Sequence, residues 1–142
     1  MNNNLDKTKN GEKKGRILVV DDNSLLRDTF RSLLEDTKLY SVQTVQGGKA
    51  AINLLKHQTF DLLITDYNMP EMNGYELFKR CKTIRPELPV VFMTGNTSNI
   101  QKIEKAKIEG VVGCIYKPFD ISDVIKMVDI SIRMNTKEID YD

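Results

Sequence analysis

The stretch RILVVDDNSLLRDTF, residues 16–30, sets an apolar run directly against two adjacent carboxylates, Asp21 and Asp22. A short, β-branched apolar run is typical of a buried strand, and the residues after it follow a helical spacing. The apolar residues of this helix, Leu25 included, are expected to share one buried face. Ligands of an open α/β sheet bind beyond the carboxyl ends of its strands. The two acids therefore mark the first part of a candidate site.

Four further apolar or β-branched runs follow in the chain, and helical patterns separate them. The runs are YSVQTV at 40–45, DLLITD at 61–66, PVVFM at 89–93 and VVGCIY at 111–116. Five strands that alternate with five helices predict an α/β doubly wound fold. Three of the strands are almost continuously apolar, which favours a parallel sheet covered on both faces.

The length of 142 residues and the 40% hydrophobic content are those of one globular domain. Residues 1–15 are too polar to bury a core and are predicted to be a disordered tail. The domain is expected over residues 16–134, with a short tail at 135–142. A net charge of +1 provides no broad basic field for nucleic acid. Two distant cysteines, no signal segment and no spanning apolar run predict a cytoplasmic protein without membrane insertion.

The other strands also end in polar residues: Asp66 ends the third strand, Thr94 the fourth and Lys117 the fifth. Together with Asp21 and Asp22, three carboxylates would meet at one edge of the sheet. At ~4 Å and an effective dielectric constant near 20, each carboxylate pair costs roughly 4 kcal/mol. One lysine does not offset this repulsion. Either some of the acids are protonated, or a divalent cation lies among them, and oxygen ligands of this kind favour Mg²⁺.

A magnesium ion beside a carboxylate, a hydroxyl and an ammonium group is suited to phosphoryl transfer. A carboxylate can itself be the nucleophile and form an aspartyl phosphate. Asp66 is the best candidate, because it ends a central strand and a turn-rich loop, YNMPEMNG at 67–74, follows it. Taken alone, the adjacent acids Asp21 and Asp22 are equally consistent with a helix N-cap. The whole set of residues favours the metal site.

Four motifs now stand in order at strand ends: VVDDN at 19–23, ITDYNMPEMNGYEL at 64–77, FMTGN at 92–96 and YKPF at 116–119. With these motifs, residues 16–134 resemble the receiver domain of the two-component response regulators, the CheY-like superfamily. The resemblance implies a flavodoxin-like sheet of five parallel strands in the order 2-1-3-4-5. It implies that Asp66 accepts a phosphoryl group from a histidine kinase or phosphorelay partner. No enzymatic activity is then expected beyond self-phosphotransfer and autodephosphorylation.

The resemblance also implies individual roles for the site residues. The implied magnesium ligands are the carboxylates of Asp21, Asp22 and Asp66 and the backbone carbonyl of Asn68. Thr94 would hydrogen-bond a phosphoryl oxygen, and Lys117 would pair with the phosphoryl group. The Lys117–Pro118 bond would be a cis peptide, which proline tolerates. Asn68 and Asn96 stand at positions that tune the lifetime of the phosphoryl group in this family.

One position departs from the family pattern. Regulators of this kind usually carry Tyr or Phe three residues before the lysine, as the aromatic partner of the switch threonine. Here that position is Cys114, and the aromatic residue is Tyr116, two residues later. Alternation along a strand places both side chains on one face. We therefore state the hypothesis that Tyr116 substitutes for the missing aromatic residue in coupling to Thr94.

The implied partners are a sensor histidine kinase or a histidine phosphotransfer protein. The output would be the binding of a downstream protein, or a homodimer, through the face formed by the fourth helix, the fifth strand and the fifth helix. Its candidate residues are Ile100, Lys102, Lys105 and Tyr116. No direct nucleic-acid binding is expected. The chain would be a stand-alone receiver or the receiver part of a longer DNA-binding regulator.

Three other readings are weaker. A magnesium-dependent phosphatase with an Asp nucleophile would be expected to place a D-x-D sequence after the first strand, where this chain has Asp21-Asp22-Asn23. A degenerate receiver that acts as a scaffold without phosphorylation does not require the intact set of Asp22, Asp66, Thr94 and Lys117. A nucleotide-binding flavodoxin-like protein lacks support, because no Gly-rich phosphate loop follows the first strand.

Overall fold

The structure is a computed structural model, and it describes residues 13–135. Residues 1–12 and 136–142, which make up most of the two predicted tails, lie outside the described part of the chain. Gly15 already belongs to the first strand, and the last helix continues to Asn135. Among the helices in this part, none has both the length and the apolar character that crossing a bilayer requires.

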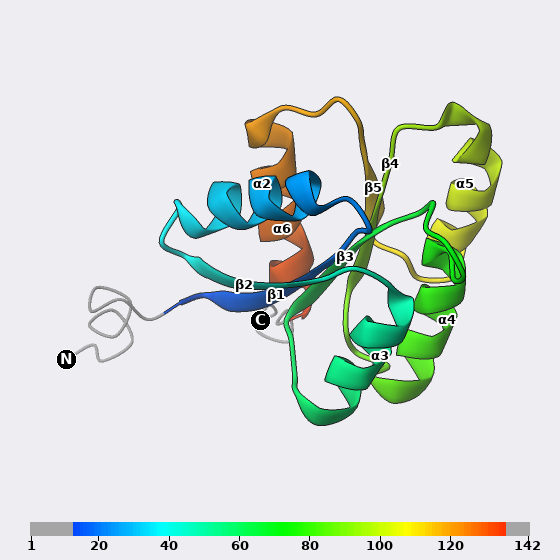
Figure 1. The fold of residues 1–142 in the computed structure, drawn as a ribbon, viewed down its shortest axis with the longest axis horizontal. Helices are drawn as coiled ribbons and strands as arrows, with labels where there is room; N and C mark the ends of the chain where they lie inside the picture. The colour runs from blue at the N-terminus through cyan, green and yellow to red at the C-terminus, as the bar shows by residue number, and fades with distance from the viewer. Residues whose placement is uncertain (1–12, 136–142) are drawn as a thin grey trace, which may run out of the picture.

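A single parallel sheet carries the fold (Figure 1). Its strands are β1 (Gly15–Val20), β2 (Tyr40–Val45), β3 (Leu62–Asp66), β4 (Val90–Thr94) and β5 (Gly113–Tyr116). The helices are α2 (Ser24–Glu35), α3 (Gly48–His57), α4 (Gly74–Ile84), α5 (Ile100–Ile108) and α6 (Ile121–Asn135), with a short 3₁₀ turn η1 (Thr97–Asn99). The strand order is β2-β1-β3-β4-β5 and all four pairings are parallel. The predicted doubly wound topology is confirmed.

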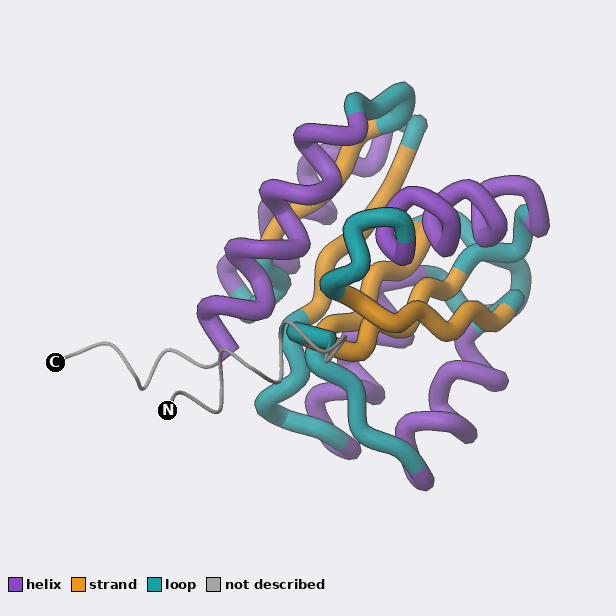
Figure 2. The backbone as a smooth tube through the Cα atoms, turned by 90° about the vertical axis from the view of Figure 1, so that its left-hand side faces the viewer, coloured by secondary structure: helices purple, strands orange, loops and turns teal. Residues whose placement is uncertain are grey.

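Helices cover both faces of the sheet, and the tube view in Figure 2 shows the strands between them. Helices α2 and α6 pack on one face, where Phe30 and Val128 meet apolar side chains of the strands. Helices α3, α4 and α5 pack on the other face, with Leu55, Leu77 and Ile103 in its core. Strands β3 and β4 are buried at every residue. This double burial explains why both strands are largely apolar, with Thr65 and the terminal residues Asp66 and Thr94 as the buried polar exceptions.

Helix α2 corrects one detail of the prediction. Leu25 was expected on the buried face, but 72% of its surface is exposed. The buried residues of α2 are Phe30 and Leu34, four residues apart. Leu25 precedes Phe30 by five residues, which places it about 140° around the helix from that face. It therefore points to solvent near the start of α2.

The start of α2 also decides between the two interpretations of the acid pair. The N-cap of α2 is Asn23, whose side chain accepts hydrogen bonds from the backbone N–H groups of Leu25 and Leu26, at 2.9 and 3.2 Å. An Asn in this position satisfies backbone donors that the first helical turn leaves free. The interpretation of Asp21 and Asp22 as capping residues is therefore wrong, because Asn23 is the residue that caps α2.

Candidate functional site

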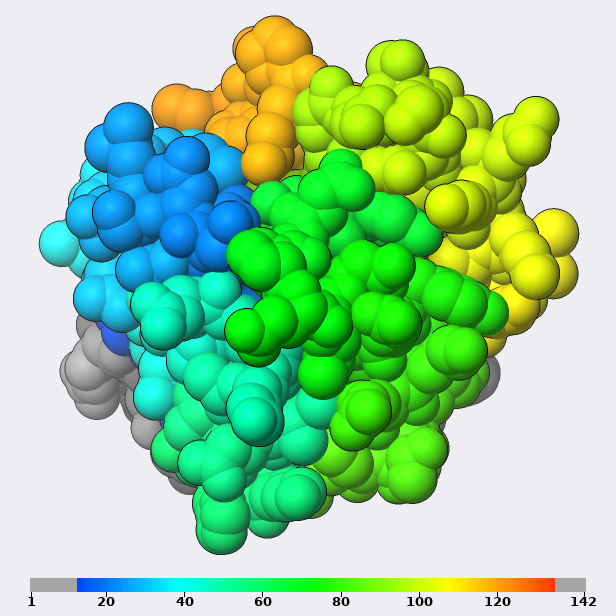
Figure 3. Space-filling view, turned by 45° about the vertical axis from the view of Figure 1, so that its right-hand side comes forward, coloured from blue at the N-terminus to red at the C-terminus, as the bar shows by residue number. Residues whose placement is uncertain are grey.

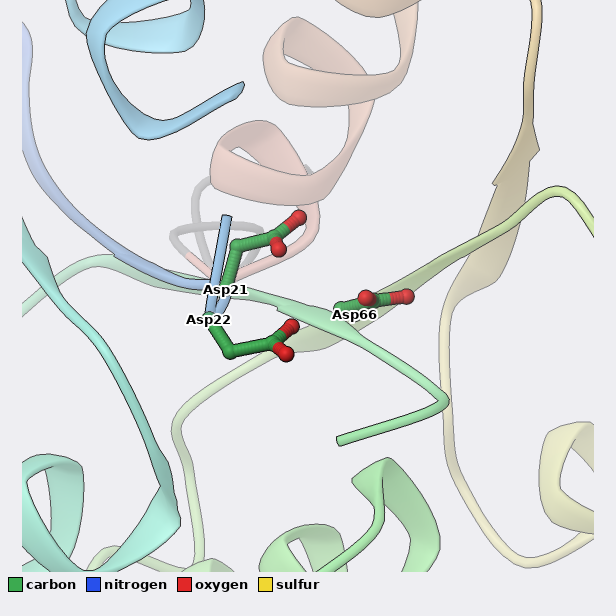
Figure 4. Close-up of side chains that lie close together, drawn as sticks. All are labelled: Asp21, Asp22 and Asp66. Atoms are coloured by element: carbon green, nitrogen blue, oxygen red, sulfur yellow. The ribbon is translucent and has the colours of Figure 1, made fainter. Parts of the chain in front are cut away.

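Three carboxylates converge at the carboxyl edge of the sheet. Asp21 and Asp22 directly follow β1, and Asp66 ends the neighbouring strand β3. Figure 4 shows the carboxylates of Asp21 and Asp22 on the side where Asp66 lies. One oxygen atom of each carboxylate lies within 4.8 Å of the other two. In the space-filling view, the blue start of α2, the green loop after β3 and the orange segment after β5 meet on one face (Figure 3).

Asp21 is the most enclosed of the three acids. Its Oδ1 accepts a hydrogen bond of 2.9 Å from the backbone N–H of Asn23. Its Oδ2 is buried and has no hydrogen-bond partner among residues 13–135, although the ammonium group of Lys117 lies 3.8 Å away. Burial raises the pKa of Asp21, while the Asn23 N–H and the Lys117 charge act in the opposite direction. An orphaned, buried carboxylate oxygen of this kind is costly unless a cation or a proton joins it.

Asp66 is buried between the acid pair and Lys117, whose Nζ lies 3.7 Å from Asp66 Oδ1. Burial raises the pKa of Asp66 to about 6, and the negative charge of Asp21 adds to this shift. Lys117 and a hydrogen bond from the backbone N–H of Asn68 partly offset it. A single lysine therefore serves both Asp21 and Asp66, and it leaves the cluster with an excess of negative charge.

The backbone around Asp66 is fixed by its neighbours in the chain. The N–H of Tyr67 donates to the carbonyl of Met93 at 2.8 Å, and the buried Tyr67 ring packs edge-on against Phe92, with 5.3 Å between the ring centres. The N–H of Gly74 then donates to the carbonyl of Tyr67 at 2.8 Å. A Cβ atom at Gly74 would lie 3.0 Å from the carbonyl oxygen of Asp66. Glycine thus lets the first turn of α4 pack directly on the backbone of Asp66.

Thr94 ends β4, next to β3, and is fully buried. Its Oγ1 accepts a 3.1 Å hydrogen bond from the backbone N–H of Asn96 and a longer one, 3.4 Å, from the side-chain amide of Asn68. A threonine hydroxyl offers two acceptor sites and one proton. With both acceptor sites in use, the proton of Thr94 remains available for a new acceptor. Asn68 contacts both Asp66 and Thr94, and Asn96 meets Thr94 through its backbone.

The end of β5 supplies the cation. The backbone N–H of Lys117 donates to the carbonyl of Thr94 at 2.9 Å, and the Lys117–Pro118 peptide bond is cis. Cys114 is buried on the face of the sheet covered by α3, α4 and α5. Tyr116 is 39% exposed at the edge of the sheet. The structure thus brings Asp21, Asp22, Asp66 and Lys117 together and places Thr94 one strand away.

Sequence reasoning missed Arg27, which is half-buried in α2. Its guanidinium group donates a 2.7 Å hydrogen bond to the backbone carbonyl of Asp21. This bond holds the chain at the point where β1 turns into the acid pair. The sequence does show a basic residue, Arg27, in the first turn of the helix that follows Asp21 and Asp22.

Helix phase separates one candidate residue of the predicted partner face, Lys102, from Tyr116. The hydroxyl of Tyr75, in α4, donates to the Glu109 carboxylate at the end of α5, at 2.6 Å. Lys102 is seven residues before Glu109, or about two helical turns, so it lies on the α4 side of α5. Glu104 and Lys107 are on the other side, close enough to Tyr116 for their charges to affect the pKa of its hydroxyl group. Lys102 thus lies on the α4 side of α5, and the partner face as a whole stays a prediction.

Comparisons with known proteins agree with this geometry. Residues 17–129 match the family model of the response regulator receiver domain. The chemotaxis protein CheY-3 of Vibrio cholerae is 36% identical over 119 residues, which cover 82% of this chain and 91% of the relative. The transcriptional regulatory protein FixJ of Bradyrhizobium diazoefficiens is 32% identical over 120 residues, covering 84% of this chain and 58% of FixJ.

Solved structures give the same result. A response regulator receiver domain protein from Clostridium thermocellum superposes with a TM-score of 0.81 at 25% identity, covering 87% of this chain and 98% of that one. The family match covers most of the chain, and the fold and the acid cluster at the end of β1 and β3 are in place. The chain belongs to the response regulator receiver domain family.

Proposed function

We propose that this chain is a phosphorylation-controlled switch in which Asp66 accepts a phosphoryl group from a phosphohistidine of a sensor kinase or a histidine phosphotransfer protein. The observation that carries the proposal is the arrangement around Asp66. A buried carboxylate stands between an acid pair and a lysine, with a buried threonine hydroxyl at the end of the next strand. These are the groups that phosphoryl transfer to a carboxylate needs.

The proposed reaction exchanges one bond to phosphorus for another. A carboxylate oxygen of Asp66 attacks the phosphorus atom and forms the P–O bond of an acyl phosphate. The P–N bond to the donor imidazole breaks, and its electron pair leaves with the imidazole nitrogen. With acetyl phosphate as donor, a P–O bond breaks and acetate leaves. In both cases Asp66 must be ionised, which a pKa of about 6 allows at neutral pH.

The acid cluster fits a divalent cation on the chemistry of its donors. Asp21, Asp22 and Asp66, when ionised, carry three negative charges against the one positive charge of Lys117. At 4.8 Å and an effective dielectric constant of 20, each carboxylate pair costs about 3.5 kcal/mol. Within the described part of the chain, the buried Asp21 Oδ2 has no hydrogen bond. Mg²⁺ favours such carboxylate oxygens and neutralises charge on a transferring phosphoryl group.

Two further groups are proposed to stabilise the product. The ammonium group of Lys117, now 3.7 Å from Asp66, would pair with a phosphoryl oxygen. The free proton of the Thr94 hydroxyl would donate to another. These contacts exist only with the phosphoryl group present, so they supply the difference in free energy that shifts the population of conformers.

The proposed output is protein binding rather than catalysis on a separate substrate. We propose that a downstream protein, or a second copy of the chain, binds the face formed by α5, β5 and α6. Direct binding of nucleic acid is not proposed, since the chain as a whole carries a net charge of only +1. A scaffold that works without phosphorylation is the second candidate, and the observation that favours it is Cys114 at the position of the family's aromatic residue.

The test is the mass of the intact protein after incubation with Mg²⁺ and acetyl phosphate. We expect one phosphoryl adduct, which is lost in Asp66→Asn and without Mg²⁺. The matched control is Asp61→Asn, the same substitution at the residue before the start of β3. There the Asp61 carboxylate accepts a hydrogen bond from the backbone N–H of Arg16. This control should keep the adduct. Absence of the adduct from the native protein would reject the switch and leave the scaffold as the better candidate.

A further inference from the structure

Cys114, at the position where the family has its aromatic residue, cannot transmit a movement of Thr94 to the surface. Cys114 is small and buried, and it pairs with Phe92 in the register of β4 and β5. Burial raises the pKa of its thiol to about 11, so the group is neutral at physiological pH. A buried, neutral thiol offers no surface that changes when Thr94 moves.

Tyr116 lies where it can respond to a movement of Thr94. In the register of β4 and β5, Tyr116 is the direct partner of Thr94. Partners in adjacent strands are about 5 Å apart, and their side chains leave the sheet on the same face. The hydrogen bond from the Lys117 N–H to the Thr94 carbonyl keeps the two strand ends together at this point. The Tyr116 side chain therefore starts beside that of Thr94.

The other end of the Tyr116 side chain reaches the surface. Its hydroxyl lies against the Cys114 thiol, and the charges of Lys107 and Glu104 act on it. Lys107 and Glu104 form an ion pair of 3.0 Å on α5. Ile100 is four residues before Glu104, on the same side of the helix, and is 41% exposed. We call Ile100, Glu104 and Lys107 the α5 stripe.

We infer that Tyr116 is the aromatic partner of Thr94 in this chain and that it passes the phosphorylation signal to the α5 stripe, where a partner protein reads it. The inference rests on the proposed phosphorylation of Asp66. When the Thr94 hydroxyl donates its free proton to a phosphoryl oxygen, the Thr94 side chain moves toward the phosphoryl group and away from its register partner Tyr116. The contacts of Tyr116 with Cys114 and Lys107 change in turn, and so does the surface around Ile100.

The experiment follows tyrosine ring and isoleucine methyl resonances by NMR in the full chain, before and after addition of Mg²⁺ and acetyl phosphate, with the adduct monitored by mass. Tyr116→Phe assigns the Tyr116 signal. We expect the Tyr116 and Ile100 signals to shift as the adduct forms. The control is the Tyr75 signal, because the Tyr75 hydroxyl is also bonded to a carboxylate but lies at the α4 contact. It should not shift.

Two variants test the route of the signal. Thr94→Val removes a proposed contact of the phosphoryl group and should lower the yield of the adduct, so the spectra are compared at equal adduct fraction by mass; the Tyr116 shift per adduct should be lost. Tyr116→Val should keep the adduct and lose the Ile100 shift, whereas Tyr75→Phe should keep both. A native adduct without any Tyr116 shift would overturn the inference and leave the proposed function intact. A shift that persists in Thr94→Val would also overturn it. Absence of the adduct from the native protein would reject the proposed function, and this inference with it.

Discussion

Replacing Asp66 with Asn should stabilise the protein at pH 8 in the absence of divalent cations. The substitution keeps the size of the side chain and its ability to accept a hydrogen bond from the Asn68 N–H. It removes the negative charge that burial and Asp21 oppose. A site built for chemistry thus holds its nucleophile at a cost to the stability of the fold.

The magnitude follows from the pKa. A pKa of Asp66 raised from 3.8 to about 6 corresponds to about 3 kcal/mol at a pH above both values. Part of this gain is lost, because Lys117 keeps only Asp21 as a partner in the variant. We therefore expect Asp66→Asn to raise the free energy of unfolding by about 1–3 kcal/mol at pH 8.

The sign of the pH dependence is fixed by the same shift. The folded protein holds the proton of Asp66 more tightly than the unfolded chain does, so ionisation of Asp66 destabilises the native state as the pH rises from about 4 to 6. Below this window Asp66 is protonated in both states. The advantage of the variant should therefore be complete above about pH 6 and vanish near pH 4.

The assay is urea unfolding of the native protein and the variant in EDTA at pH 4 and pH 8. With a slope of about 1–3 kcal/mol per molar urea, the midpoint at pH 8 should rise by roughly 0.5–2 M in the variant. Addition of Mg²⁺ should narrow the difference, because the ion stabilises the native protein more than the variant. A variant that is less stable at pH 8, or whose effect is equal at both pH values, would refute the charge argument.

Three further substitutions test the surroundings of Asp66. Lys117→Met should raise the pKa of Asp66 above 6, because the positive charge of Lys117 lowers it. The measurement is an NMR titration of the Asp66 carboxyl carbon, and an unchanged pKa would contradict the ion pair. Gly74→Ala should lower the free energy of unfolding by about 1–3 kcal/mol in urea, because its Cβ would lie 3.0 Å from a backbone oxygen of Asp66; full stability would mean that the loop gives way easily. Arg27→Ala should weaken Mg²⁺ binding about tenfold by calorimetry, since the bond that holds the Asp21 carbonyl is lost. Equal affinity would show that β1 alone holds Asp21.

The parts of the site that sequence predicts are those that depend on topology alone. Asp21, Asp66, Thr94 and Lys117 each end or follow a strand, and the carboxyl ends of parallel strands share one edge. The rule that places ligands at this edge needs only strand order and strand ends. A strand end is visible in sequence as the abrupt change from apolar to polar residues.

The parts that sequence does not predict depend on the rotation of helices and on side-chain rotamers. Leu25 has the right residue type for a buried face, yet the angle set by Phe30 and Leu34 turns it to solvent. Lys102 lies on the α4 side of α5 because it is about two helical turns before Glu109, whose carboxylate accepts a hydrogen bond from Tyr75. The reach of Arg27 to a backbone carbonyl needs one particular rotamer among many. None of these three features produces a recognisable pattern of residue types in the sequence.

The pairing of the strands has a consequence for how the domain deforms. Strand β3, which ends in Asp66, is hydrogen-bonded to β1 on one side and β4 on the other, whereas β5 has a neighbour on one side only. Stiffness should therefore decline across the sheet from β3 to β5, and amide hydrogen exchange should be slowest in β3 and faster at the outer edge of β5. The reacting atoms at the end of β3 would then keep their positions during phosphorylation. The structural change that accommodates the new group would be largest in β5, at the edge of the sheet, where a partner protein can make contact.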